Sequence, residues 1–151
     1  MKVVSLFLPV LIFLSISCSE MDDALLETEE IGVYANVDTI TFDTLLAGRT
    51  SFTKRARLFN PSEQTVELTS LSLRMGESSP YDLTINGITA KSHRSVSIRG
   101  NDSLLVLVNL TAPFENEMRV SAVRDELEWE DPLTENYQSV VLESWAVSAE
   151  E

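Results

Sequence analysis

Hydrophobic and polar residues alternate over short stretches from Val33 to Ser148, and turn residues separate these stretches. A period of two is typical of β-strands with one buried face, and no stretch keeps helical spacing over a persuasive length. The eight candidate strands lie in NVDTITFDTLLAG, SFTKRARLFN, QTVELTSLSLRMG, PYDLTING, RSVSIRG, SLLVLVNLTA, DELEWED and QSVVLESWAVS. Because no helix separates them, the pattern predicts an all-β protein. The expected fold is an immunoglobulin-like antiparallel β-sandwich of about seven to eight strands over residues 33–148.

The stretch QTVELTSLSLRMG contains an odd step between its apolar residues. Val66 and Leu68 share one face, whereas Leu71 and Leu73 follow on the other phase of the alternation. A β-bulge near Thr69 and Ser70 would keep all four side chains inward. We therefore predict an interrupted strand that still contributes its apolar residues to the core.

Two other patterns place the centre of a sheet and a hairpin. Residues 104–108 are apolar at every position, which predicts a central strand that is covered on both faces. Asn86-Gly87, between alternating stretches, is a strong signal for a tight hairpin turn. Trp129 shares a face with Leu127 and is expected in the core.

Residues 1–17 have the layout of a secretory signal peptide. Lys2 is followed by an apolar run from Val3 to Leu14, and small polar residues precede Cys18. As a permanent membrane span this run is short, because a helix that crosses the hydrocarbon needs about 20 apolar residues. We therefore expect the protein to be exported and this segment to be removed.

Ser15, Ile16, Ser17 and Cys18 resemble the lipobox of bacterial lipoproteins, in which a peptidase cuts before a cysteine that has been diacylated on its sulfur. The resemblance implies cleavage between Ser17 and Cys18, and lipid attachment at Cys18, the only cysteine of the chain. Ser15 departs from the Leu, Val or Ile that is usual at its position. The alternative is an ordinary signal peptide with a chance cysteine at its end. Acyl chains on Cys18 would make the membrane a lasting partner of the protein.

Residues 18–32 are expected to carry the lipid anchor and an acidic tether. The sequence SEMDDALLETEE contains six carboxylates and no base, a composition that favours an extended, solvated segment. It also resembles the acidic export signal of surface-exposed lipoproteins of the Bacteroidetes type, while a linker without sorting content is the alternative. Ser19 beside the anchor is compatible with outer-membrane sorting. The expected location is the outer membrane, on its periplasmic or its surface side.

The balance of charges narrows the classes of function. With 11 Lys and Arg against 24 Asp and Glu, the chain has a formal net charge of -13, so most of its surface would repel a nucleic-acid backbone. A single cysteine cannot form an internal disulfide. With His93 as the only histidine, there are too few soft ligands for a closed zinc site. We expect no nucleic-acid partner, no metal and no cofactor.

Several short motifs follow one another in an order that points to a family. They are Asp38-Thr39-Ile40 with Phe42-Asp43-Thr44, Asn60, Asn86-Gly87, Asp102-Ser103-Leu104, and Asp125, Leu127 and Trp129. In this order they resemble the amino-terminal immunoglobulin-like domain of a large group of uncharacterised Bacteroidetes lipoproteins. Larger members of that group continue into a right-handed parallel β-helix. Because this sequence ends soon after its last strand, the resemblance implies the module alone, with residues 149–151 as a tail.

The acidic positions Glu126, Glu128 and Glu130 are candidates for a Ca²⁺ site, with Asp125 and Asp131 beside them. Strand residues two apart point the same way about 6 to 7 Å from one another, which suits a solvated face better than a cage of ligands. We therefore expect an exposed acidic face.

No pattern in the sequence points to a catalytic site. No pair of carboxylates has a spacing that points to glycoside cleavage. His93 is expected in a loop without a nucleophile beside it. We therefore predict that the protein is not an enzyme.

Trp145 is the candidate contact residue. It follows Glu143 on the outer phase of the last strand, so the side chain is a candidate for stacking on a glycan or packing against a partner protein. Packing of Trp145 over the sheet edge is the interpretation that the sequence favours, and contact with a ligand is the alternative. The expected function is a non-catalytic cell-envelope lipoprotein that serves as a binding or scaffold module for an unknown envelope protein or glycan. The alternatives are an accessory module of a surface polysaccharide-degrading system and a subunit of a surface assembly.

Overall fold

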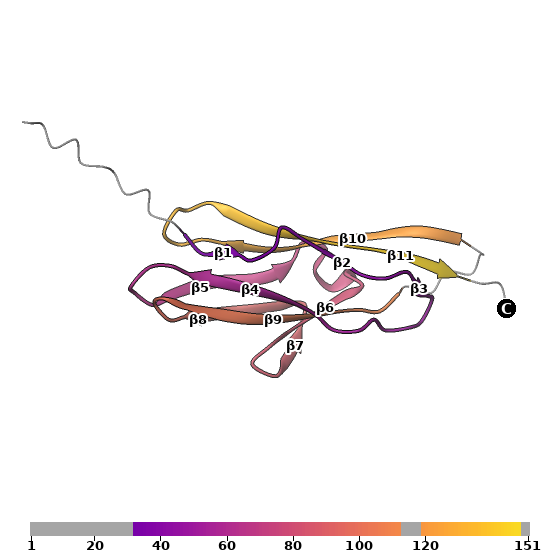
Figure 1. Ribbon diagram of the computed structural model, residues 1–151, viewed down its shortest axis with the longest axis horizontal. Coiled ribbons are helices and arrows are strands. Elements are labelled where there is room, and N and C mark those ends of the chain that lie inside the picture. The colour runs from indigo at the N-terminus through magenta and orange to yellow at the C-terminus, as the bar shows by residue number, and fades with distance from the viewer. Residues whose placement is uncertain (1–31, 113–118, 149–151) are drawn as a thin grey trace, which may run out of the picture.

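The computed structural model describes residues 32–112 and 119–148, in which two β-sheets pack face to face (Figure 1). The first sheet has the strand order β1 (Tyr34–Ala35), β4 (Lys54–Asn60), β9 (Asp102–Leu110), β6 (Tyr81–Ile85) and β7 (Ile88–Ala90). The second has the order β2 (Thr39–Thr41), β11 (Tyr137–Ser148), β10 (Arg119–Glu130), β5 (Val66–Leu73) and β8 (Ser92–Ile98), and β3 (Leu45–Leu46) also pairs with β11. A short 3₁₀ helix covers Gly76–Ser78. The predicted all-β sandwich is confirmed.

The structure has more strands than the seven to eight that were predicted, because one predicted strand is divided and β7, which follows the Asn86-Gly87 turn, was not predicted. The stretch NVDTITFDTLLAG, together with the residues just before it, forms β1 in the first sheet and β2 and β3 in the second. Asn36 lies where the chain changes sheets: its Oδ1 accepts a hydrogen bond from the Arg57 backbone N–H at 2.7 Å. Both β2 and β3 run parallel to β11, so the sandwich is not purely antiparallel.

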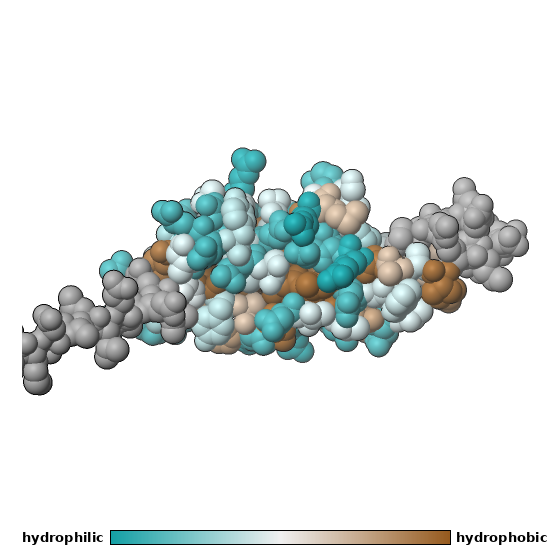
Figure 2. All heavy atoms as spheres, turned by 90° about the horizontal axis from the view of Figure 1, so that it is seen from above, coloured by the Kyte–Doolittle hydropathy of each residue, from teal (hydrophilic) through white to brown (hydrophobic). Residues whose placement is uncertain are grey.

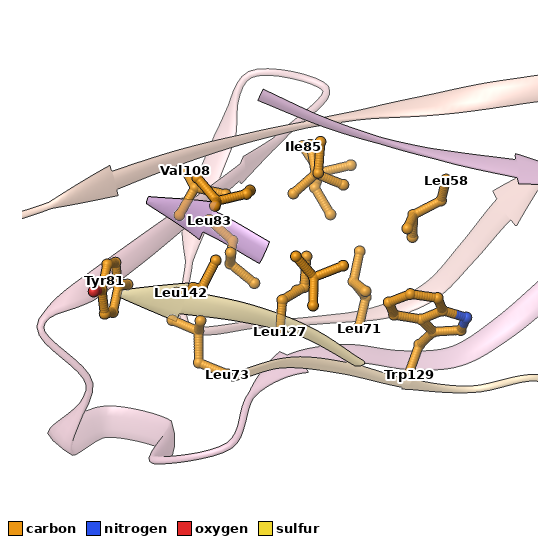
Figure 3. Packing of buried hydrophobic residues seen from close by; sticks show 14 of the residues in the cluster. Leu58, Leu71, Leu73, Tyr81, Leu83, Ile85, Val108, Leu127, Trp129 and Leu142 are labelled. Atoms are coloured by element: carbon orange, nitrogen blue, oxygen red, sulfur yellow. The ribbon is translucent and has the colours of Figure 1, made fainter. Parts of the chain in front are cut away.

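The core lies between the inner faces of the two sheets (Figure 3). Figure 3 shows Leu58, Leu83 and Val108 of the first sheet facing Leu127 and other side chains of the second. Trp129 is also buried here, as predicted, with 2% of its surface exposed, and its Nε1 donates a hydrogen bond to the Val33 carbonyl at 3.2 Å. The alternation read from the sequence thus assigned the inward residues of these strands correctly.

The odd step in β5 places its four apolar residues inward as predicted, but the predicted bulge is wrong. All four of these side chains are buried, yet β5 keeps one register with β8 on both sides of Thr69. An extra residue on one strand would shift that register. Instead, Ser95, which lies across from Thr69, has a φ of 52°. At this pair of residues, both strands switch which positions of the alternation point into the core.

The strand β9 is central in its sheet, as predicted, between β4 and β6. The prediction that both of its faces are covered is wrong. Leu105 is 37% exposed, because the described residues include no third layer over that side of the sheet. On the neighbouring strand β4, Arg55 pairs with Leu107 and Arg57 pairs with Leu105. The aliphatic part of an arginine side chain can cover a leucine that is partly exposed to water.

The hairpin turn at Asn86-Gly87 is confirmed. The φ angles are 51° and 81°, and Ile85 pairs with Ile88 across the turn. Positive φ at both central residues is the requirement of a type I′ turn, which explains an asparagine followed by a glycine.

His93 does not lie in a loop, which corrects the prediction. It is part of β8, and its Nε2 is 3.3 Å from the Leu83 carbonyl oxygen. Lys91, just before β8, forms an ion pair with Asp82 at 2.9 Å and donates to the Ser79 carbonyl at 2.8 Å. Both side chains therefore tie β8 to β6, the neighbouring strand of the other sheet.

Candidate functional site

The outer face of the second sheet carries exposed apolar side chains near the end of β11. Leu46, Val147 and Val120 lie in one row across β3, β11 and β10, because Val147 pairs with both of the others. Leu46 and Val120 are each more than 60% exposed. Figure 2 views the molecule from the side of β10 and β11 and shows hydrophobic surface at this end among hydrophilic side chains. We call these three residues the apolar row.

Trp145 lies in the next row and is 54% exposed. The alternation of β11 turns Glu143, Trp145 and Val147 outward, while the residues between them face the core. One of those inward residues, Ser144, donates a hydrogen bond from its Oγ to the Asp43 carbonyl at 2.9 Å. This contact holds β11 against the segment between β2 and β3, so Trp145 stands on a fixed backbone.

A shallow hollow of about 220 Å³ lies beside the Trp145 indole. Ala122 pairs with Trp145 across β10 and β11, and its small side chain leaves the space open. On the far side of the hollow from the apolar row lie Arg124 and Glu143, which also pair across the two strands. Thr41 completes this polar side. Trp145 therefore forms an aromatic wall of the hollow and Ala122 its small floor. Arg124, Glu143 and Thr41 form a polar wall that carries one positive and one negative charge.

The polar wall keeps hydrogen-bonding capacity for a ligand. Thr41 Oγ1 donates to Glu143 Oε1 at 3.2 Å, which orients the carboxylate. Within residues 32–112 and 119–148, Arg124 forms no ion pair, although Glu143 stands opposite it in the sheet. A guanidinium and a carboxylate are thus presented side by side, a donor group next to an acceptor group.

A buried tyrosine supports the strand beneath the hollow from the opposite sheet. The Tyr81 hydroxyl donates to the Val123 carbonyl at 2.9 Å, and Figure 3 shows its ring at one end of the core. Burial, and then the nearby charges of Asp125 and Glu143, raise the pKa of Tyr81 well above its ordinary value. The phenol therefore keeps its proton, and its hydrogen bond to β10, to a higher pH than an exposed tyrosine would.

The alternation of β10 turns Glu126, Glu128 and Glu130 to its outer face, as predicted. Glu126 and Glu128 are partly exposed and form ion pairs with Arg74 at 2.8 and 3.2 Å. The flanking aspartates are buried: Asp125 Oδ1 accepts hydrogen bonds from the backbone N–H groups of Met75 and Glu126, and Asp131 Oδ1 accepts one from the backbone N–H of Leu133. In the described ranges, no three His, Cys, Asp or Glu side chains are grouped so that they would hold a metal ion.

The other residues singled out in the sequence lie elsewhere. Ser17 and Cys18, with the expected signal peptide, fall outside the described residues. Across the part of the chain that the structure describes, no helix is long and apolar enough to cross a membrane. The sequence pattern pointed to Trp145 but missed Thr41, Ala122 and Arg124. The sequence does place these three residues on the outward phase of their strands. That phase identifies them as neighbours of Trp145 only when the pairing of the strands is known.

The two sheets packed face to face form an immunoglobulin-like β-sandwich. It is similar to a protein of unknown function from Porphyromonas gingivalis W83 (TM-score 0.52, 13% identity, 78% of this chain and 49% of that one). A family 123 glycoside hydrolase from Clostridium perfringens also matches (TM-score 0.52, 10% identity, 76% and 24%). The PapD-like domain 7 of human CEP192 matches over 89% of this chain and 97% of that one, with a TM-score of 0.48 and 15% identity.

No protein-family model and no curated protein matches the sequence. This chain spans less than half of the bacterial proteins with TM-scores of 0.52. At these identities the similarity shows the fold alone, so any activity has to be argued from the residues of this chain.

Proposed function

We propose that this protein is a non-catalytic binding or scaffold module of the cell envelope, held on the outer membrane by lipid on Cys18. The observation that supports a binding role is the half-exposed Trp145 beside the apolar row on the outer face of the second sheet. Tryptophan and arginine are the residues most enriched among those that dominate binding energy at interfaces. Here Trp145 and Arg124 line the same hollow.

The anchor is supported by the sequence. Cys18 follows an apolar run at the position that the lipobox chemistry requires, and an acidic tether separates it from the sandwich. The resemblance to uncharacterised Bacteroidetes lipoproteins with an immunoglobulin-like module agrees with this arrangement. A lipid anchor, a tether and a module with an exposed aromatic face together form a device for holding a partner near the membrane.

Mass spectrometry of the mature amino terminus tests the anchor. We expect residues 1–17 to be absent and Cys18 to carry acyl chains, while a Cys18→Ala variant should stay unprocessed. An intact Met1, or an unmodified Cys18 thiol, would contradict the proposal.

Affinity capture from native outer membranes tests the binding role. The full-length protein should retain a constant set of partners that the Trp145→Ala variant loses. Tyr137→Ala is the matched control, because Tyr137 is an exposed aromatic on the same face of the same strand, about 26 Å away at about 3.3 Å per residue. If both variants, or neither, lose the partners, the Trp145 face is not the contact surface.

A further inference from the structure

The geometry points to a single pyranose ring of a neutral glycan as the group that occupies the hollow beside Trp145. This inference rests on the proposed binding function and names the ligand of its contact surface. The hollow is open and measures about 220 Å³. That is below the range of about 300 to 1,000 Å³ that is typical of pockets for drug-sized ligands, so one ring is the natural occupant.

The Trp145 indole supplies the wall for one face of the ring. The C–H face of a pyranose is apolar, so packing it against an exposed indole removes apolar area of both partners from water. Ala122, across the strand pair from Trp145, has a side chain too short to fill the space, so a ring can lie against the indole.

The polar wall does not favour ligands that carry a net charge. Arg124 and Glu143 carry opposite charges in the same hollow, so the attraction of one for an ionic ligand is offset by the repulsion of the other, and the wall gives a net charge no advantage. A neutral ligand avoids that repulsion. The overall charge of -13 adds to the penalty for anionic polymers.

Sugar hydroxyls match this wall because each donates one hydrogen bond and accepts others. The Arg124 guanidinium only donates and the ionised Glu143 only accepts, so two neighbouring hydroxyls on one ring satisfy both groups. Thr41 already donates to Glu143 at 3.2 Å, which leaves the remaining acceptor positions of the carboxylate for the sugar. An aromatic wall with a mixed donor and acceptor wall is therefore a site for a hydroxyl-rich neutral ring.

Binding to an array of immobilised oligosaccharides tests the inference, with the full-length protein in detergent micelles. The array carries neutral oligosaccharides of glucose, galactose, mannose and N-acetylglucosamine, and uronic-acid and sulfated ones of the same lengths. The best ligand is then titrated by isothermal calorimetry, a measurement that works equally for variants that lack Trp145. We expect a neutral oligosaccharide to bind and the charged ones to bind at least several-fold more weakly.

Variants separate the roles of the two walls. Trp145→Ala should weaken binding by about tenfold or more, whereas Trp145→Phe should retain part of it, since a smaller aromatic wall remains. Arg124→Gln and Glu143→Gln should each cost several-fold, and Tyr137→Ala should have no effect. Because Trp129 is buried, its fluorescence reports whether each variant is folded.

Three results would overturn the inference: no oligosaccharide on the array binds, Trp145→Ala binds as well as the unmodified protein, or charged oligosaccharides bind more tightly than neutral ones. Capture of a protein partner that depends on Trp145, without any glycan binding, would also overturn it. In that case the proposed binding function stands with a protein as its partner. If Trp145-dependent capture fails as well, the proposed function fails too.

Discussion

Asn60 connects the two sheets at one end of the sandwich, and replacing it tests how the fold is held together. Its side chain is 1% exposed. Nδ2 donates to the carbonyls of Gln64, Ile98 and Arg99 at 2.8, 3.0 and 3.2 Å, and Oδ1 accepts from the backbone N–H and the Oγ of Ser62 at 3.1 and 2.8 Å. One amide thus joins the end of β4 in the first sheet to the end of β8 in the second.

The Asn60→Ala variant removes all of these contacts at once. At roughly 1 kcal/mol for each net hydrogen bond, with two donors shared among three carbonyls, the expected loss is about 2 to 4 kcal/mol of unfolding free energy. That is a large part of the roughly 5 to 15 kcal/mol that stabilises a typical domain.

The Asn60→Asp variant has nearly the same shape but replaces the donor with an oxygen that faces three carbonyls. This environment disfavours the charged carboxyl, so its pKa should be raised in the folded protein. A raised folded pKa means that the folded state holds a proton that the unfolded state has already lost. The variant should therefore become less stable as the pH rises above the unfolded value of about 3.9. We expect it to be closer to the unmodified protein at pH 4 than at pH 7.

Urea denaturation, followed by the fluorescence of the buried Trp129, measures these effects. Asn136→Ala is the control, because Asn136 is exposed and the change should stay within about 0.5 kcal/mol. A cost of less than about 1 kcal/mol for Asn60→Ala would show that this amide does not hold the two sheets together. An equal difference between Asn60→Asp and the unmodified protein at both pH values would contradict the raised pKa.

Three further substitutions test other parts of the fold. Tyr81→Phe should cost about 1 to 2 kcal/mol by leaving the Val123 carbonyl without its donor. Because burial raises the pKa of Tyr81, the unfolding free energy of the unmodified protein should fall as the pH rises above the unfolded tyrosine value of about 10. The unfolding free energy of Tyr81→Phe should fall less steeply over the same pH range, and an equal fall for both proteins in urea titrations would contradict this. Gly87→Ala should lower the thermal midpoint through about 1 to 2 kcal/mol of backbone strain at φ 81°, since an added Cβ meets nothing within 4 Å; an unchanged midpoint would argue against it. Leu127→Ala should cost about 2 to 5 kcal/mol in urea denaturation, because its side chain is fully buried, and a cost below about 1 kcal/mol would contradict that burial.

Local patterns in the sequence were sufficient for the fold class and for many of its details. Leu127 and Trp129 were placed in the core, and Asn86-Gly87 was recognised as a hairpin turn. These features depend on the period of side chains along one strand, or on the backbone preferences of two adjacent residues. Neighbouring positions in the chain carry that information, so no knowledge of the rest of the fold was needed.

Features that depend on pairing between distant segments were not predictable in the same way. The division of residues 34–46 among β1, β2 and β3 follows from which strands accept them, and the parallel partners of β2 and β3 lie at the other end of the chain. His93 was expected in a loop, yet it lies in β8, where its Nε2 is 3.3 Å from the Leu83 carbonyl oxygen. Neither outcome leaves a signal within a short stretch of sequence.

The candidate site shows the same division. The alternation along the last strand identified Trp145 as an outward residue, because that is a property of one strand. The hollow beside it needs Thr41 from β2 and Ala122 and Arg124 from β10, and these residues come together only through the pairing of three strands. Local sequence patterns were enough to predict the fold class and one outward-facing aromatic residue, Trp145. The tertiary structure alone decided that this residue has a small floor and a polar wall beside it, because the strand register sets which side chains become neighbours.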